Sequence, residues 1–144
     1  MRRFAFIDVE LPKLGAFLGL CDKWIQACPL KDATEANVLT LKEKLGTLLN
    51  EETHLMRLRA LGPAIVKDMI CYVGDRYKHN VGNPLLDLLG EAFLLYAVPQ
   101  LDGLDHKDIQ GICIELKLLF AESAAWQNIM ARIQSLYPHV PLKE

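Results

Sequence analysis

Two adjacent arginines near the start of the chain, Arg2 and Arg3, carry the side chains best suited to phosphate chemistry. A guanidinium group holds a fixed positive charge and a planar fork of N–H donors, which fits a phosphoryl group better than an ammonium does. Phosphoryl transfer spreads negative charge over the oxygens of the γ-phosphoryl group, so such donors stabilise it. Two interpretations stand: Arg2 and Arg3 bind a phosphate, or they form a solvated edge before the apolar stretch Phe4–Leu11.

Cysteine and histidine, the usual metal ligands and nucleophiles, are scattered along the chain. The cysteines contain no Cys-x-x-Cys pair and fall where helical stripes place apolar residues, which favours reduced core thiols over disulfides or metal. The histidines lack the i, i+3 or i, i+4 spacing of a helical metal site, so they are interpreted as solvated surface residues. These residues are Cys21, Cys28, Cys71, Cys113, His54, His79, His106 and His139.

The chain lacks the motifs of an independent enzyme. It contains no Gly-x-x-x-x-Gly-Lys-[Ser/Thr] phosphate loop, no apolar strand ending in paired acids to hold Mg²⁺, and no Gly-x-Ser-x-Gly elbow. The acids Asp68, Asp75 and Glu91 form no convincing acid and base pair and are interpreted as solvated helix faces. Spread charge on an exposed face is also favoured over a phosphate-binding or partner-binding patch for five basic residues, namely Arg57, Arg59, Lys67, Arg76 and Lys78.

The composition predicts one compact domain with no general affinity for polyanions. With 144 residues, 51% of them hydrophobic, the chain can bury a substantial core. A formal net charge of −2 gives no general attraction to nucleic acid or to an anionic membrane. No apolar run reaches the roughly 18 residues of a membrane helix, and the start lacks a signal-peptide layout. The cytoplasm is therefore the expected location.

The sequence predicts one short strand at residues 4–10 and helices in the rest of the chain. A lone strand leaves its N–H and C=O groups without partners, which indicates that the chain belongs to something larger. Apolar residues at spacings of three and four then predict about six amphipathic helices in an irregular all-α bundle. Their stripes are Leu14–Cys28, Val38–Leu48, Val66–Tyr77, Leu85–Tyr96, Ile109–Phe120 and Trp126–Leu136.

The predicted helix starts follow from capping chemistry. Asp32 is the expected cap of the second helix, with Glu35 reaching back as in a capping box. Proline fits the first position of a helix because its missing N–H costs no hydrogen bond there. On this basis Pro63 and Pro84 each begin a helix. Residues 55–60 form either a loop or a single helical turn.

Three segments carry a resemblance to a known family. They are Arg2–Pro12 with its Arg-Arg-Phe run, Leu61–Val73 with Gly-Pro at its start, and Ala92–Leu104 with its Pro-Gln-Leu-Asp-Gly-Leu string. In this order they resemble the last core strand, the Gly-Pro-Arg helix and the Pro-Gln-Leu-x-Gly-Leu segment of AAA+ ATPases of the methyl-directed restriction group. Together with the helix that follows, the resemblance covers residues 2 to about 119.

The resemblance implies roles for two sets of residues. Arg2 or Arg3, or both, would be an arginine finger that reaches the nucleotide of the neighbouring subunit in a ring. The turn formed by Gly62, Pro63 and Ala64 would lie near the nucleotide of its own subunit, although Gly62 and Pro63 also suit simple helix initiation. The family usually has an arginine that senses the γ-phosphate where this chain has Ala64. Three explanations stay open: sensing is lost, the residue was substituted deliberately, or a neighbouring cation replaces the arginine, with Arg57, Arg59 and Lys67 as candidates.

The function implied by this resemblance is mechanical. Residues 1–11 would be the last strand of the nucleotide-binding core, 12–137 the helical lid, and 138–144 a C-terminal tail. The lid would couple nucleotide state to the arrangement of subunits in a homo-oligomeric ring, with the rest of the core and the neighbouring subunits as partners. It would bind no cofactor alone, no metal, no membrane and no nucleic acid, while the parent protein would use ATP or GTP with Mg²⁺. The alternative is a free-standing helical protein-interaction module.

Overall fold

The computed structural model describes residues 10–28, 30, 33–79 and 84–142, and this part of the chain contains helices and no strand. The all-α prediction is confirmed for these residues. They form seven α-helices rather than about six, because His54–Leu58 form a short helix that covers much of the stretch 55–60, for which the sequence allows either a loop or a helical turn. The elements are α1 (Leu14–Ala27), α2 (Glu35–Leu48), α3 (His54–Leu58), α4 (Pro63–His79), α5 (Leu85–Ala92), the π-helical η2 (Phe93–Ala97), the 3-10 helix η3 (Val98–Leu101), α6 (His106–Phe120) and α7 (Trp126–Leu136).

The predicted strand cannot be compared with the structure over most of its length. Residues 1–9 lie outside the described residues, and they include both Arg2 and Arg3. Glu10 and Leu11, at the end of the proposed core segment, adopt neither helix nor strand and lead directly into α1.

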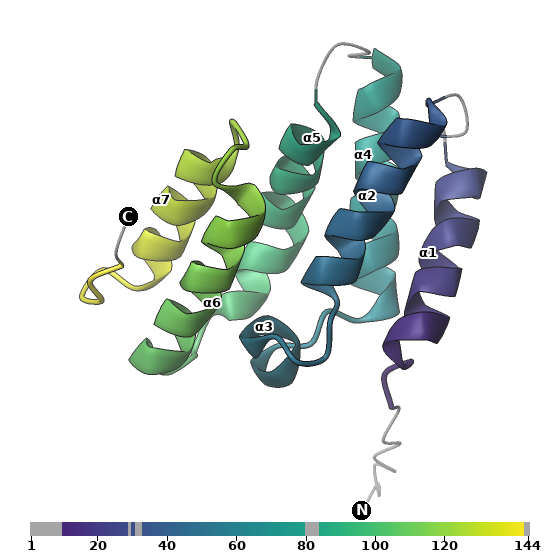
Figure 1. The fold of residues 1–144 in the computed structure, drawn as a ribbon. Helices are drawn as coiled ribbons and strands as arrows, with labels where there is room; N and C mark the ends of the chain where they lie inside the picture. The colour runs from purple at the N-terminus through teal and green to yellow at the C-terminus, as the bar shows by residue number, and fades with distance from the viewer. Residues whose placement is uncertain (1–9, 29, 31–32, 80–83, 143–144) are drawn as a thin grey trace, which may run out of the picture.

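The helices pack side by side as a layered bundle (Figure 1). Helix α4 packs against α1 and α5, α2 also packs against α1 and α5, and α6 packs against α3 and α7. Helices α1, α4 and α6 begin at the end of the bundle where α3 lies, whereas α2, α5 and α7 begin at the opposite end (Figure 1). The start of α1 and the loop that enters α4 therefore share one end of the molecule.

A continuous apolar core holds these helices together. The predicted stripes supply it: Phe17 of α1, Leu45 of α2 and Met69 of α4 are at most 1% exposed. Phe93 and Phe120 meet at its centre with ring centroids 5.5 Å apart, which joins η2 to α6. Burial of this apolar surface, rather than the propensity of any single helix, is the main source of stability for such short elements.

Two predicted helix starts shift by one or two residues. Helix α2 begins after Thr34, whose hydroxyl accepts a hydrogen bond from the backbone N–H of Asn37 at 3.3 Å. Thr34 is thus the observed cap, and Asp32 lies outside the described residues. Pro63 is the first residue of α4, as predicted. Pro84 instead occupies the cap position before α5, with an extended ψ of 135°.

The stretch predicted as one helix from Leu85 to Pro99 changes its hydrogen-bond pattern midway. The α-helix ends at Ala92, a π-helical turn covers Phe93–Ala97, and the chain tightens into a 3-10 helix at Val98. Since the same apolar face continues through all three, spacing in the sequence does not reveal the change. The described part of the tail packs back, because Val140 is buried and its carbonyl accepts a bond from Gln134.

Candidate functional site

The turn at Gly62, Pro63 and Ala64 is fixed by the short helix before it and the long helix after it. Leu61 is fully buried, and its backbone N–H points at the sulfur of Met56 in α3, 3.4 Å away. The carbonyl of Gly62 accepts the first hydrogen bond of α4, from Val66 at 3.1 Å. Ala64 follows on the first turn and is exposed. The turn therefore presents the start of α4 to solvent at the end of the bundle where α1 also begins (Figure 1).

Arg59 links this turn region to the Pro99–Leu104 segment, the third of the resembling strings. Its guanidinium donates through Nη1 to the carbonyl of Leu58 and through Nη2 to the carbonyl of Asp102, each at 3.3 Å. Asp102 is 43 residues further along the chain. Next to it, Gly103 has a φ of +77°, a conformation that suits glycine and few other residues. Arg59, two residues before the second of the three segments, is thus in direct contact with the third.

Tyr137 also holds the Pro99–Leu104 segment, through two hydrogen bonds. Its buried hydroxyl donates to the carbonyl of Leu101 and accepts the backbone N–H of Leu104, the latter at 2.8 Å. Asp105 then caps α6, because its carboxylate accepts the N–H of His106 at 2.6 Å. The loop between η3 and α6 is therefore held at both of its ends.

The three cations proposed as substitutes for the missing arginine differ in how they are held. Arg59 is tied to backbone carbonyls, as described above. Arg57 and Lys67 are exposed, and the side chain of neither forms a hydrogen bond or an ion pair with the part of the chain that the structure describes. Lys67 lies close enough to Cys28 that its charge offsets a small part of the rise in pKa that burial causes in that thiol. Both Arg57 and Arg59 precede the turn and are exposed, but only the guanidinium of Arg59 has partners among the described residues.

Other residues interpreted as solvated have partners in the structure. Glu91 accepts a hydrogen bond from the Tyr72 hydroxyl at 3.0 Å and lies 3.6 Å from Nε of Arg76. His54, predicted as a solvated surface histidine, is 54% exposed and has its Nδ1 2.7 Å from Oε1 of Glu115. Sequence reasoning missed the Tyr72–Glu91 and His54–Glu115 pairs because their members are 19 and 61 residues apart.

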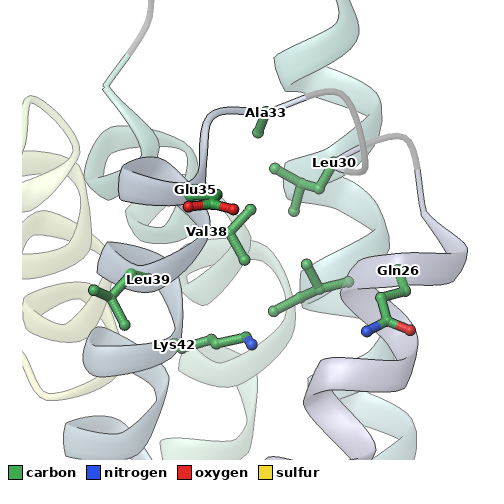
Figure 2. Close-up of a pocket in the computed structure, with 8 residues that line it drawn as sticks. Gln26, Leu30, Ala33, Glu35, Val38, Leu39 and Lys42 are labelled. Atoms are coloured by element: carbon green, nitrogen blue, oxygen red, sulfur yellow. The ribbon is translucent and has the colours of Figure 1, made fainter.

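A cavity of about 510 Å³ lies between α1 and α2 (Figure 2). Apolar side chains supply most of its wall, and Val38 and Lys42 reach from α2 toward Gln26 on α1 (Figure 2). The amine of Lys42 is engaged with Asp22 at 2.8 Å. Among the described residues that line this hollow there is no nucleophile beside a general base, so it carries no catalytic assignment.

The cysteines fall into two kinds. Cys21 and Cys113 are buried singly, and burial raises the pKa of each thiol to about 11. Cys28 and Cys71 instead lie together, with their sulfur atoms 2.8 Å apart. No group of three or more cysteine, histidine or acidic residues able to hold a metal ion occurs among the described residues.

Comparisons with known proteins assign no family to this arrangement. No family model matches the chain, and no match was found among the curated proteins or the solved structures. Among the helices that the structure describes, none combines the length and apolar character needed to cross a bilayer.

Proposed function

We propose that this chain is the C-terminal helical lid of a AAA+ ATPase of the methyl-directed restriction group, with residues 1–11 as the last strand of the nucleotide-binding core. Its task is to couple nucleotide state to the arrangement of subunits in a ring. The chain alone does not hydrolyse nucleotide, because its sequence lacks a phosphate loop and Mg²⁺-binding acids. The parent protein supplies these parts and uses ATP or GTP with Mg²⁺ in the cytoplasm.

The observation that carries this proposal is the position of the Gly62–Pro63 turn at the end of the bundle where α1 begins (Figure 1). The proposed core strand precedes α1 directly in the sequence, so a core attached through it adjoins that same end. A lid requires this arrangement, since the turn that approaches the nucleotide must face the core. A turn at the opposite end of α4 would have offered no support.

The contacts behind the turn offer a route for transmitting its movement. Arg59 joins the turn region to Asp102, and Tyr137 joins the following loop to α7. Glu115 of α6 holds the start of α3, which directly precedes the turn. A displacement of the turn is therefore resisted by α6 and α7 together, and the lid moves as one body. Rigid movement is what converts a small change at a nucleotide into a change between subunits.

Within this proposal the charged residues have separate roles. Arg2 and Arg3, outside the described residues, act as arginine fingers on the nucleotide of the neighbouring subunit. Ala64 has no charge with which to sense the γ-phosphate. Arg57, which is exposed on the helix that precedes the turn, takes that role in its own subunit, whereas Arg59 keeps a structural role because backbone carbonyls hold its guanidinium.

One observation favours the alternative of a protein-interaction module. Ile114 and Leu118 lie one turn apart on α6 and are 66% and 85% exposed. Two large apolar residues on one exposed helix face are typical of a contact surface for another protein. In the lid proposal this face lies against another part of the ring. Replacing both by glutamine separates the two accounts, since only the lid proposal predicts a loss of nucleotide-dependent assembly.

Nucleotide binding tests the proposal directly. Calorimetry with the isolated chain and ATP or GTP is expected to show no binding tighter than millimolar, because the residues that wrap phosphates are missing. The product of the complete reading frame, including all residues upstream of Met1, is expected to contain a phosphate loop and to hydrolyse nucleotide. A complete product without a phosphate loop, or tight binding by the isolated chain, would refute the lid assignment.

A further inference from the structure

Two of the four cysteines meet across the interface between α1 and α4. Cys28 is the cap residue directly after α1, and Cys71 lies near the middle of α4, 43 residues later. Their Sγ atoms are 2.8 Å apart, so little movement separates them from a covalent bond. We propose that Cys28 and Cys71 form an intramolecular disulfide when the protein meets a peroxide, joining the end of α1 to α4.

The two thiols differ in exposure, which sets the order of reaction. Cys28 is only 8% exposed, whereas Cys71 is half-buried. Lys67 and Asp75 flank Cys71 at four-residue intervals on the exposed side of α4. Burial, followed by the hydrogen bond with Cys71, raises the pKa of Cys28 to about 12. Because the thiolate is the reactive form and peroxide arrives from solvent, Cys71 reacts first and Cys28 resolves the product.

The chemistry balances with one peroxide for each pair of thiols. The Cys71 thiolate attacks a peroxide oxygen, the O–O bond breaks, and the departing hydroxide takes up the thiol proton as water, which leaves a sulfenic acid. The sulfur of Cys28 then attacks the sulfenic sulfur. The S–O bond breaks, the S–S bond forms, and the Cys28 proton leaves with the hydroxyl group as a second water. Both sulfurs are oxidised while the peroxide is reduced.

Metal binding is the other function that two neighbouring thiols could have. Structural zinc requires four ligands from cysteine, histidine or acidic side chains. Among the described residues no three such groups converge anywhere, so this pair cannot complete a zinc site from that part of the chain. The geometry favours the disulfide.

The bond would restrain the helix next to the proposed core strand. It closes a loop that contains α2, α3 and the Gly62–Pro63 turn. Cross-linking over such a length removes conformational freedom from the unfolded chain, which corresponds to a rise in Tm of roughly 10 °C for a domain of this size. This inference does not depend on the lid proposal, since it uses only the α1 and α4 contact.

Peptide mapping of the wild-type chain tests the proposal. The reduced protein is treated with hydrogen peroxide at neutral pH, the remaining thiols are alkylated, and unreduced peptides are analysed by mass spectrometry. The expected result is one cross-linked peptide pair containing Cys28 and Cys71, lighter by two hydrogen atoms, with Cys21 and Cys113 alkylated. The cross-link is lost in Cys28→Ser and in Cys71→Ser, and it persists in the matched variants Cys21→Ser and Cys113→Ser.

Thermal unfolding of the same wild-type samples supplies a second readout that needs no variant. The oxidised protein is expected to unfold roughly 10 °C above the reduced protein, and dithiothreitol is expected to reverse the difference. Three outcomes overturn the proposal: Cys71 oxidised beyond the sulfenic acid with Cys28 still open to alkylation, a cross-link between two chains, or a pair that includes Cys21 or Cys113. A disulfide between Cys28 and Cys71 that forms without a rise in Tm would contradict the proposal that the bond restrains the end of α1.

Discussion

Glu115 of α6 caps the first turn of α3 from outside that helix. Its two carboxylate oxygens accept the backbone N–H of His54 at 2.9 and 3.0 Å, and Oε1 also lies 2.7 Å from the His54 ring nitrogen Nδ1. Thr53 contributes the local cap, since its hydroxyl accepts the N–H of Met56. A five-residue helix is not stable alone. The position of α3, and with it the approach to the Gly62–Pro63 turn, thus depends on a side chain 61 residues away.

Replacing this carboxylate should loosen α3. Glu115→Ala removes the acceptor for the N–H and ring of His54, so the free energy of unfolding is expected to fall by about 1–2 kcal/mol, as for the loss of a helix cap. Chemical denaturation measures this change. Glu43→Ala, at an exposed position of α2, is the matched control and should change stability by less than about 0.5 kcal/mol. Equal effects of the two substitutions would show that Glu115 does not hold α3.

Gly90 should not tolerate even one added methyl group. A Cβ at this position of α5 would lie 2.8 Å from the Cβ of Ala125 and 3.0 Å from Oγ of Ser123. Gly90→Ala is therefore expected to destabilise the protein by roughly 1–3 kcal/mol through overpacking against the loop between α6 and α7.

A second helical glycine provides the control for Gly90→Ala. A Cβ at Gly19 in α1 meets no atom within 4 Å, so Gly19→Ala should stabilise by up to about 1 kcal/mol through helix propensity alone. Thermal unfolding of both variants shows whether each substitution raises or lowers the stability of the protein. A stabilising Gly90→Ala substitution would mean that the described approach of α5 to that loop is wrong.

The hydroxyl of Tyr137 should contribute more to the stability of the protein than the hydroxyl of Tyr96 does. Tyr137→Phe leaves the carbonyl of Leu101 and the N–H of Leu104 without their partner in a buried position, which is expected to cost about 1–3 kcal/mol. Tyr96→Phe is the control, since the Tyr96 hydroxyl forms no hydrogen bond with the described part of the chain, while its ring packs against Tyr72 and the core. Indistinguishable denaturation midpoints for the two variants would contradict a role for Tyr137 in fixing the loop before α6.

Alkaline pH should weaken the fold through its buried thiols. Burial raises the pKa of Cys21 and Cys113 from 9.0 to about 11 in the folded protein. Between these two values the unfolded chain has lost thiol protons that the folded chain retains. Stability from these groups is therefore fully present below about pH 9 and is lost as the pH rises toward about 11.

Cysteine variants isolate this effect from the titration of lysine and tyrosine. Melting temperatures measured from about pH 8 to pH 10.5 should fall less steeply for Cys21→Ala and for Cys113→Ala than for the wild type, because each variant lacks one titrating thiol. Parallel curves for all three proteins would show that burial of these thiols does not contribute to alkaline instability.

Local patterns in the sequence predict the helices well and the contacts between them poorly. The apolar spacing of Val66, Met69, Ile70 and Val73 indicates one buried face, and Pro63 marks where that helix begins. Nothing local distinguishes the π-helical turn at Phe93 from an α-helix, since both keep the same face buried. The Glu115 cap and the Cys28 to Cys71 contact join residues far apart in sequence, so they depend on how the helices pack.

The measurement that tests the lid assignment most directly is nucleotide hydrolysis by mixed rings of the parent protein. One subunit carries Arg2→Ala and Arg3→Ala, and the other lacks the lysine of the phosphate loop. The rate of nucleotide hydrolysis by rings of either variant alone should fall on the order of 1,000-fold or more, which is the contribution of an arginine finger. Mixing them should restore hydrolysis, because some interfaces then pair an intact arginine with an intact phosphate loop. Full activity of the arginine variant alone, or no recovery on mixing, would contradict the account.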